Sequence, residues 1–193
     1  MPSPSPPPGL VVRPLEWRDL DDLREMYYHL YEERASGDFV GIPLFDRRPS
    51  IADEVAWFQG HFRAVLEGHE IFLVAEIGGH AVGSCTIGGG RFGPASEESH
   101  VGTLGILVHS RHRGKGVGSA LLERALSEAR SKYELVYLQV FSENARAREL
   151  YRRFGFTGCG HQPRAVKRGG RYLDKDEMVL DLAEHPMASD ANR

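Results

Sequence analysis

Residues 101–130 read VGTLGILVHSRHRGKGVGSALLERALSEAR, and this stretch decides how the chain folds. Its apolar run, 104–108, predicts a buried strand, and residues 116–130 have the composition of a helix. Between the two lie basic residues and three glycines, Gly114, Gly116 and Gly118. A strand that passes through a glycine loop directly into a helix is typical of a phosphate-binding turn.

The chemistry of phosphate binding explains why these residue types occur together. Glycines let the backbone approach an anion closely, and the start of a helix offers unpaired N–H groups and the positive end of its dipole. Arg111, Arg113 and Lys115 add local positive charge. The alternative is that the glycines only let strand and helix pack closely. Under either interpretation the helix presents one core-facing stripe, made of Val117, Ala120, Leu121, Ala125 and Ala129.

Two other kinds of phosphate loop fit the spacing poorly. A P-loop needs Gly-Lys followed by Ser or Thr, whereas Lys115 is followed by Gly116. A dinucleotide-binding loop needs a third glycine where this chain has Ser119. A nucleotide-binding enzyme of another fold therefore remains only as an alternative.

A second informative segment begins at Asn144. Asn144, Ala147, Arg148 and Tyr151 are spaced so that they fall on one face of a predicted helix, and the first and last lie about 10 Å apart along its axis. That length suits an extended ligand arm. The simpler interpretations are that Asn144 caps the helix and that Tyr151 belongs to the core.

Together the two segments resemble the GNAT superfamily of acyl-CoA-dependent N-acetyltransferases. The loop pattern of that family is Arg or Gln, two residues, Gly, one residue, and Gly or Ala, which Arg111, Gly114 and Gly116 match. Asn144, Ala147, Leu150 and Tyr151, followed by Phe154-Gly155-Phe156, match the family's next helix and its exit turn. The resemblance covers most of residues 10–182 and is strongest over 101–156.

The resemblance implies a GNAT fold, which is a mixed α/β sheet, mostly antiparallel, splayed at the CoA site and flanked by helices. It also implies that backbone N–H groups of 113–119 hold the CoA pyrophosphate, while the strand before the loop binds the pantetheine arm. The implied binding residues for acetyl-CoA are Ile106, Leu107, Val108, Arg113, Gly114, Lys115, Gly116, Val117, Gly118, Ser119, Asn144, Ala147 and Tyr151. In this scheme the N–H of Ile106 or a neighbour polarises the thioester carbonyl, and Tyr151 is the catalytic residue that protonates or stabilises the leaving thiolate.

The general base stays open at this point. Many family members carry a Glu on the strand before the loop, but residues 102–105 read GTLG, without a carboxylate. Glu98, His100 and Glu143 lie near the motifs, and each is also explained as a solvated residue. A water relay is an equal alternative.

The resemblance predicts an enzyme that transfers the acetyl group of acetyl-CoA to a primary amine by direct attack in a ternary complex. Residues 160–182 resemble the ending of members that act on amino acids, small amines or protein N-termini. An α-amine is neutral far more often than a lysine-like amine at pH 7, so a weak base favours an α-amine. The alternative is a noncatalytic acyl-CoA-binding regulatory module.

The remaining elements follow from periodicity and turn residues. We predict a Pro/Ser-rich disordered tail over 1–9, one domain over 10–183 and a flexible tail over 184–193. Strands are expected at 10–13, 71–77, 81–87, 101–108, 135–141, 156–159 and 177–182, and helices at 17–35, 51–66 with Ser50 as N-cap, 116–130 and 144–154. Gly78-Gly79 predicts a tight hairpin turn between the second and third strands, and Pro163 and Gly169-Gly170 are expected to interrupt the segment between the last two.

Composition limits the partners. The net charge is −3, which gives no general field for nucleic acid or an anionic membrane, and we expect neither as a partner. No export signal or membrane span is expected, and the nine histidines show no metal-ligand spacing, so we predict no metal. Cys85 and Cys159 lie in strand-like runs and are expected to be buried, reduced thiols, which favours the cytoplasm. A homodimer is left open.

Overall fold

The computed structural model describes residues 5–89 and 95–184. These residues form two compact units. Unit 1 holds residues 5–40, 44–88 and 105–129, and unit 2 holds 41–43, 89, 95–104 and 130–184. Strand β4 (Val101–Val108) contributes its first half to unit 2 and its second half to unit 1.

The sheet of unit 1 is an antiparallel meander. Strand β1 (Val11–Pro14) pairs with β2 (Glu70–Ile77), which pairs with β3 (His80–Gly89). Gly78 and Gly79, with φ of 60° and 86°, form the predicted tight turn between β2 and β3, in a backbone region that glycine enters without strain. The second half of β4 lies next to β3, where the N–H of His109 donates to the carbonyl of Val82.

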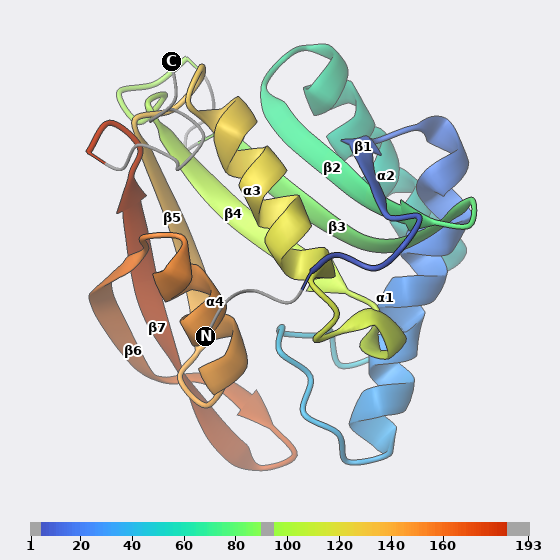
Figure 1. Ribbon diagram of the computed structural model, residues 1–193. Helices are drawn as coiled ribbons and strands as arrows, with labels where there is room; N and C mark the ends of the chain where they lie inside the picture. Colours follow the sequence, from blue (N-terminus) through green and yellow to red (C-terminus); the bar gives the residue numbers. More distant parts are fainter. Residues whose placement is uncertain (1–4, 90–94, 185–193) are drawn as a thin grey trace. The chain divides into compact units, whose positions relative to one another are not determined.

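Helices cover both faces of this sheet (Figure 1). A short 3-10 turn, η1 (Trp17–Asp19), leads into α1 (Leu20–Ala35), so the predicted helix over 17–35 starts with a tighter turn. Helix α2 (Ile51–Leu66) has the predicted cap, because the Ser50 side chain accepts from the N–H of Asp53. Helix α3 (Val117–Ala129) packs on β2 from the side opposite α2.

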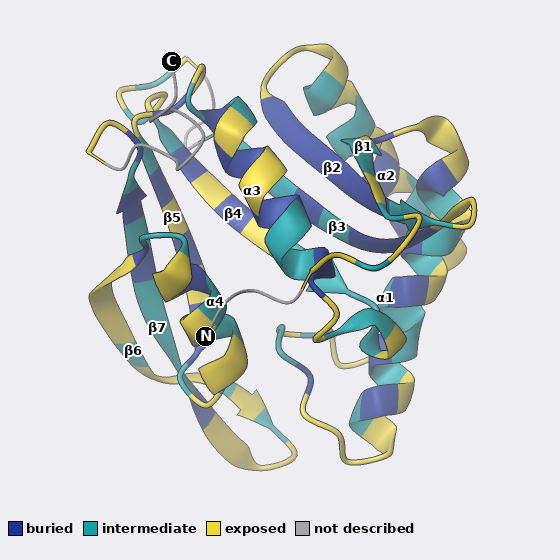
Figure 2. Ribbon diagram, in the orientation of Figure 1, coloured by how far each residue is buried: buried dark blue, intermediate teal, exposed yellow. Residues whose placement is uncertain are grey.

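Burial follows from this arrangement. Strand β2 is buried from Glu70 to Ala75, as expected for a strand with helices on both faces (Figure 2). Phe72 and Val74 pack with Phe58 of α2 and Met26 of α1 in one core cluster. On α3 the core stripe consists of Val117, Leu121, Leu122, Ala125, Leu126 and Ala129, whereas the predicted member Ala120 is only half-buried.

Unit 2 is built on strands in the order β4-β5-β7-β6. Its elements are β5 (Leu135–Phe141), α4 (Ala145–Arg153), β6 (Thr157–Arg168) and β7 (Arg171–Asp181). The first residues of β4 pair in parallel with β5, and β7 pairs antiparallel with both β5 and β6. The predicted fold class, a mixed α/β sheet with mostly antiparallel strands and flanking helices, is confirmed.

The β4–β5 ladder is short. It joins Val101, Gly102 and Thr103 to Leu135, Val136 and Tyr137, and the register goes no further although both strands continue.

The closing strands were predicted too short. Instead of 156–159 and 177–182, the chain forms a long hairpin, 157–168 with 171–181, turned by Gly169 and Gly170. Pro163 was expected to interrupt the pairing, because proline cannot donate to a ladder. The strand tolerates it through irregularities in register at 158–160 and 162–166, on the edge strand β6.

The two cysteines differ from the prediction in one respect. Cys85 on β3 is fully buried, as expected, but Cys159 on β6 is exposed. Strand β6 is exposed over most of its length (Figure 2), so an apolar residue on it does not enter the core.

The predicted tails lie mostly outside the described residues. Residues 1–4 and 185–193 are not described. At residues 7–10 a turn is closed by the N–H of Leu10, which donates to the carbonyl of Pro7 at 3.2 Å.

Candidate active site

The glycine loop of unit 1 has the geometry of an anion site. Gly114 and Gly116 both have φ of 81°, in the left-handed region. The N–H of Ala120 donates to the carbonyl of Gly116 at 3.0 Å, the bond that closes the first turn of α3. The N–H groups of 117–119 precede that bond, so they have no acceptor within the helix and lie at the positive end of its dipole. These features fit a pyrophosphate.

Arg113 is held inside unit 1. Its Nη2 lies 2.9 Å from Oε2 of Glu33 on α1, and its Nε donates to the carbonyl of Val108 at 3.0 Å. Its backbone N–H donates to the carbonyl of Ser110. The guanidinium therefore anchors the loop to α1, and the exposed residues Arg111 and Lys115 supply the outward positive charge.

A pair of stacked histidines lies at the base of the loop. The rings of His29 and His109 are 4.7 Å apart and nearly parallel, and Nε2 of His29 lies 3.0 Å from Oγ of Ser110. Burial, followed by electrostatic interactions with neighbouring His29, His112 and Arg111, lowers the pKa of His109. His109 is therefore harder to protonate than a free imidazole.

Backbone alternation distinguishes the predicted strand residues. A Cβ on Gly83 would meet the carbonyl oxygen of Leu107 at 3.1 Å, and His109 also bonds toward β3, so the polar groups of 107 and 109 point to β3. Those of Ile106 and Val108 then point away from β3, because successive residues alternate. The carbonyl of Val108 is used by Arg113, and by the same alternation the N–H of Ile106 is directed away from β3.

Helix α4 holds the predicted residues of unit 2. The side chain of Asn144 accepts from the N–H of Ala147 at 3.1 Å, which is the N-cap interaction. Gly155, with φ of 90°, ends the helix. Tyr151 is 6% exposed and its ring packs edge-on against Phe156. Asn144 therefore caps the helix and Tyr151 is buried in the core, as the simpler interpretations of these two residues predicted.

The three candidate bases lie in different surroundings. Glu98 lines a cavity of unit 2. His100 is exposed, and its carbonyl accepts from the N–H of Glu134. Glu143 is paired with Arg171 at 2.6 Å. Of these three, Glu98 is therefore the one that lies at the cavity.

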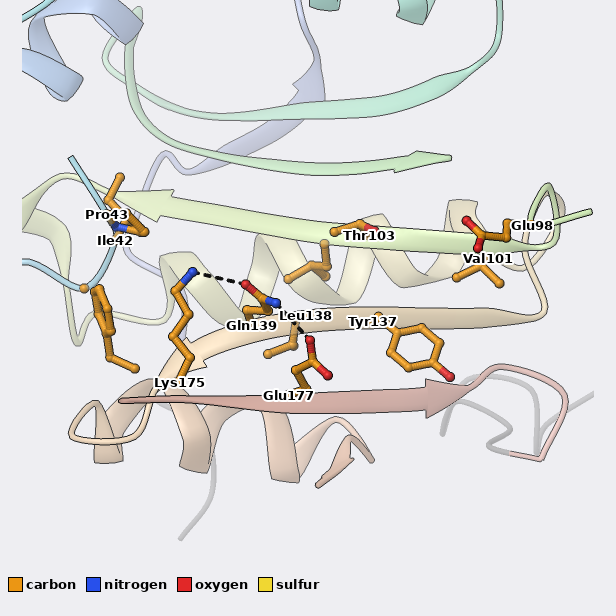
Figure 3. A pocket seen from close by; sticks show the side chains of 13 residues that line it. Ile42, Pro43, Glu98, Val101, Thr103, Tyr137, Leu138, Gln139, Lys175 and Glu177 are labelled. Atoms are coloured by element: carbon orange, nitrogen blue, oxygen red, sulfur yellow. Dashed lines mark hydrogen bonds between the residues drawn. The ribbon is translucent and has the colours of Figure 1, made fainter. Parts of the chain in front are cut away.

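The cavity of unit 2 has a volume of about 650 Å³ (Figure 3). Its walls come from the first half of β4, from β5 and β7 and from the segment at 41–43. The lining residues are Gly41, Ile42, Pro43, Glu98, Val101, Thr103, Leu104, Tyr137, Leu138, Gln139, Phe141, Lys175 and Glu177. Lys175 and Glu177 give it charges of both signs.

The sequence prediction missed this group. Tyr137, Gln139, Lys175 and Glu177 belong to none of the matched motifs, although the alternation of Tyr137 and Gln139 with buried Val136, Leu138 and Val140 indicated an outward strand face. Which residues of β7 share that face depends on the register.

The predicted site residues form two groups. Unit 1 brings together Ile106, Leu107 and Val108 with the loop residues 113–119, and unit 2 brings together Asn144, Ala147 and Tyr151 on one helix.

Within residues 5–89 and 95–184 we find no cluster of three or more His, Cys, Asp or Glu side chains suited to a metal ion. Across the same described ranges, no helix has the length and apolar character needed to cross a membrane.

Comparison with known proteins gives one matching family and several similar N-acetyltransferases. The model of the acetyltransferase (GNAT) family matches residues 17–156. An L-methionine sulfoximine/L-methionine sulfone acetyltransferase of Salmonella typhimurium is 33% identical over 182 residues, 91% of this chain and 96% of that protein. The L-amino acid N-acetyltransferase AaaT of Escherichia coli is 35% identical over 173 residues, 86% and 93% of the two chains.

A solved structure gives the same result for the fold. The Salmonella typhimurium protein yncA, solved with its cofactor acetyl-CoA, superimposes with a TM-score of 0.76 at 27% identity, covering 93% of this chain and 97% of that one. The GNAT fold predicted from the two motifs is thereby confirmed.

Proposed function

The chain belongs to the GNAT acetyltransferase family and is an N-acetyltransferase, and from this premise we propose that it acetylates the α-amine of a small amino acid with acetyl-CoA. The observation that carries the choice of acceptor is the cavity of unit 2, which is lined by Lys175 and Glu177. The amino-acid acetyltransferases of Salmonella typhimurium and Escherichia coli support the same class of acceptor.

The glycine loop is the proposed binding site for the pyrophosphate of acetyl-CoA. Its support is the left-handed Gly114 and Gly116, which carry no side chain, and the first-turn N–H groups of α3, which have no acceptor within the helix. Arg111 and Lys115 attract the anion from the exposed side. In this proposal Arg113 acts by fixing the loop, since its guanidinium bonds to Glu33 and Val108.

Acetyl-CoA supplies an activated acyl group as a thioester. Three groups of this chain have proposed roles in the transfer. The N–H of Ile106, directed away from β3, donates to the acyl oxygen, where negative charge develops. Tyr151 donates a hydrogen bond or a proton to the leaving sulfur. Glu98, which lines the cavity, accepts the amine proton either directly or through water.

The acceptor follows from the chemistry of amines and from the lining charges. An α-amine near pKa 7.7–8.0 is neutral in roughly a tenth of molecules at pH 7, whereas a lysine side chain of pKa about 10.4 is neutral in well under ~0.1%. No strand carboxylate stands beside the loop to act as a strong base, because residues 102–105 are GTLG. An enzyme of this kind favours the amine that loses its proton more easily.

The test is a panel of acceptors with acetyl-CoA, in which thiol release and acetylated product are both measured. The panel contains free amino acids, peptides with free N-termini, polyamines and N-α-blocked lysine. We expect the highest kcat/KM with free amino acids. Preferred acetylation of polyamines or of the lysine side chain contradicts the proposed acceptor, and binding of acetyl-CoA with no acceptor turned over favours a regulatory module.

A further inference from the structure

Polar side chains of unit 2 share one face of the sheet. The register places Gln139 of β5 opposite Glu177 of β7, and Glu177 opposite Gly160 of β6. Lys175 lies two residues from Glu177 and therefore on the same face. The opposite face of these strands carries the buried residues Leu138 and Met178. The face with Gln139 lines the 650 Å³ cavity, to which Leu138 also contributes (Figure 3).

Two hydrogen bonds fix the orientation of Gln139. Nζ of Lys175 donates to Oε1 of Gln139 at 3.1 Å, and Nε2 of Gln139 donates to Oε1 of Glu177 at 2.9 Å. A lysine ammonium can only donate and a carboxylate can only accept, so the amide has one orientation. The result is a row with a positive end, a neutral amide and a negative end.

The carboxylate of Glu177 is held so that its two oxygens differ. Oε1 accepts from Gln139 and also from Nε2 of Gln162, at 2.8 Å. Oε2 lies over Gly160, where a Cβ would approach it to 2.8 Å. Glycine at 160 therefore leaves the space that this carboxylate occupies, and two amide donors immobilise it.

A purely structural role explains this row less well than a binding role. Exposed ion pairs contribute little to stability, and a stabilising pair would bring Lys175 and Glu177 into direct contact. Here Gln139 separates the two charges, which leaves each able to bind an opposite charge of a ligand. The residues also line a cavity, whose wall at 41–43 is tied to β6 by Arg168, which donates to the carbonyl of Ile42 at 2.7 Å.

We propose that Lys175 and Glu177 are the specificity-determining residues of the acceptor site and recognise a zwitterionic α-amino acid. Lys175 binds the carboxylate of the acceptor, and Oε2 of Glu177 binds its ammonium group, with Gln139 beneath the Cα atom. The ammonium then loses its proton to solvent or Glu98 before acetylation. This inference rests on the proposed function and adds the residues that select the substrate.

The experiment compares each free amino acid with its α-carboxamide, in which the carboxylate is neutral. We measure kcat/KM for both acceptors and take the acid-to-amide ratio. The two amines differ in reactivity, but this difference is the same for every variant, so it cancels when the ratios of two variants are compared. In Lys175→Met we expect that ratio to fall about 10- to 100-fold, the loss of one charge-assisted hydrogen bond, mainly through KM of the acid. Lys175→Arg should restore most of it.

Matched variants separate this role from general effects. Lys167→Met removes the same charge from neighbouring β6, outside the cavity lining, and should leave the ratio unchanged. Glu177→Gln should raise KM for acid and amide alike, since both carry the ammonium. KM for acetyl-CoA should be unchanged in all four variants.

The outcomes are decisive for each proposal separately. An unchanged acid-to-amide ratio in Lys175→Met, with amino acids still acetylated, overturns the assignment of Lys175 and leaves the proposed function standing. An unchanged KM in Glu177→Gln overturns the assignment of Glu177. If the wild-type enzyme acetylates no amino acid, the proposed function fails, and the selection of a zwitterion fails with it.

Discussion

Arg113 in the glycine loop and Glu33 near the end of α1 are joined by a hydrogen-bonded ion pair of 2.9 Å, although 80 positions separate them in the sequence. The side chain of Glu33 is only 5% exposed, whereas that of Arg113 is 32% exposed. The pair therefore fixes the loop to a helix that carries none of the predicted binding residues.

Glu33→Gln should destabilise unit 1 by about 1–3 kcal/mol, because it leaves the partly buried Arg113 without its charged partner. Acetyl-CoA affinity should fall as well, since the loop loses its anchor. Urea unfolding and calorimetric titration measure the two effects. Glu32→Gln is the matched control, because Glu32 is the exposed neighbour and pairs with His29. Equal stability of the two variants would contradict the role of the pair.

Gly116→Asp should weaken acetyl-CoA binding about 10-fold or more, because it adds a side chain and a negative charge at a left-handed position of the anion site. The control is Gly68→Asp, at the end of α2, which has φ of 75° and open space around a Cβ. Both changes impose backbone strain, but only the first should alter affinity. Unchanged acetyl-CoA affinity in folded Gly116→Asp would refute the loop assignment.

Tyr151→Phe should lower kcat about 10²-fold with little change in acetyl-CoA affinity, since it removes one donor and keeps the packed ring. The control is Tyr133→Phe, which changes another buried tyrosine of unit 2. Steady-state kinetics and thermal unfolding distinguish a catalytic effect from a structural one. Wild-type turnover in Tyr151→Phe would exclude the proposed role in thiolate departure.

Asp176 should make unfolding depend on pH in the acid range. The hydrogen bond from His161, together with the hydroxyl of Ser142 and the charge of Arg148, lowers the pKa of Asp176 although burial opposes the shift. Because the pKa is lower in the folded state, the stabilisation is present at neutral pH, above the unfolded value of about 3.9, and is lost as pH falls through the folded value.

Asp176→Asn removes this contribution, so the free energy of unfolding should fall less steeply from pH 5 toward pH 2 than in the wild type. Urea unfolding at several pH values gives the slope. Asp38→Asn, at an exposed carboxylate of unit 1, is the control and should keep the wild-type slope. Identical slopes for Asp176→Asn and the wild type would show that the hydrogen bonds to Asp176 do not affect stability.

The sequence predicted those features that depend on neighbours in the chain. The cap of α2 by Ser50 needs only Asp53 three residues on, and the turn at Gly78-Gly79 needs only two glycines. Both were correct for that reason. The hairpin over 157–181 was underestimated because a local reading of Pro163 takes no account of the register shifts that accommodate it.

The candidate site was predicted only in part for a related reason. The loop and the helix α4 carry motifs with fixed spacing, but Gln139 and Glu177 meet across strands 38 positions apart, and no local pattern reveals that pairing. Likewise the sequence suggested that Arg113 contacts the ligand. Its ion pair with Glu33 could not be predicted, because the two residues are 80 positions apart and meet only in the folded unit.

The contrast between the two cysteines provides a built-in reporter. Burial raises the pKa of Cys85 to about 12, so its thiol is inert toward alkylating dyes, whereas Cys159 is exposed on β6 directly before Gly160. Burial and nearby Glu177 raise the pKa of Cys159, which calls for mildly alkaline labelling. A maleimide fluorophore would thus attach at one position of the unaltered sequence, on the strand beside Glu177. Its emission could follow filling of the cavity in real time, without any engineered residue.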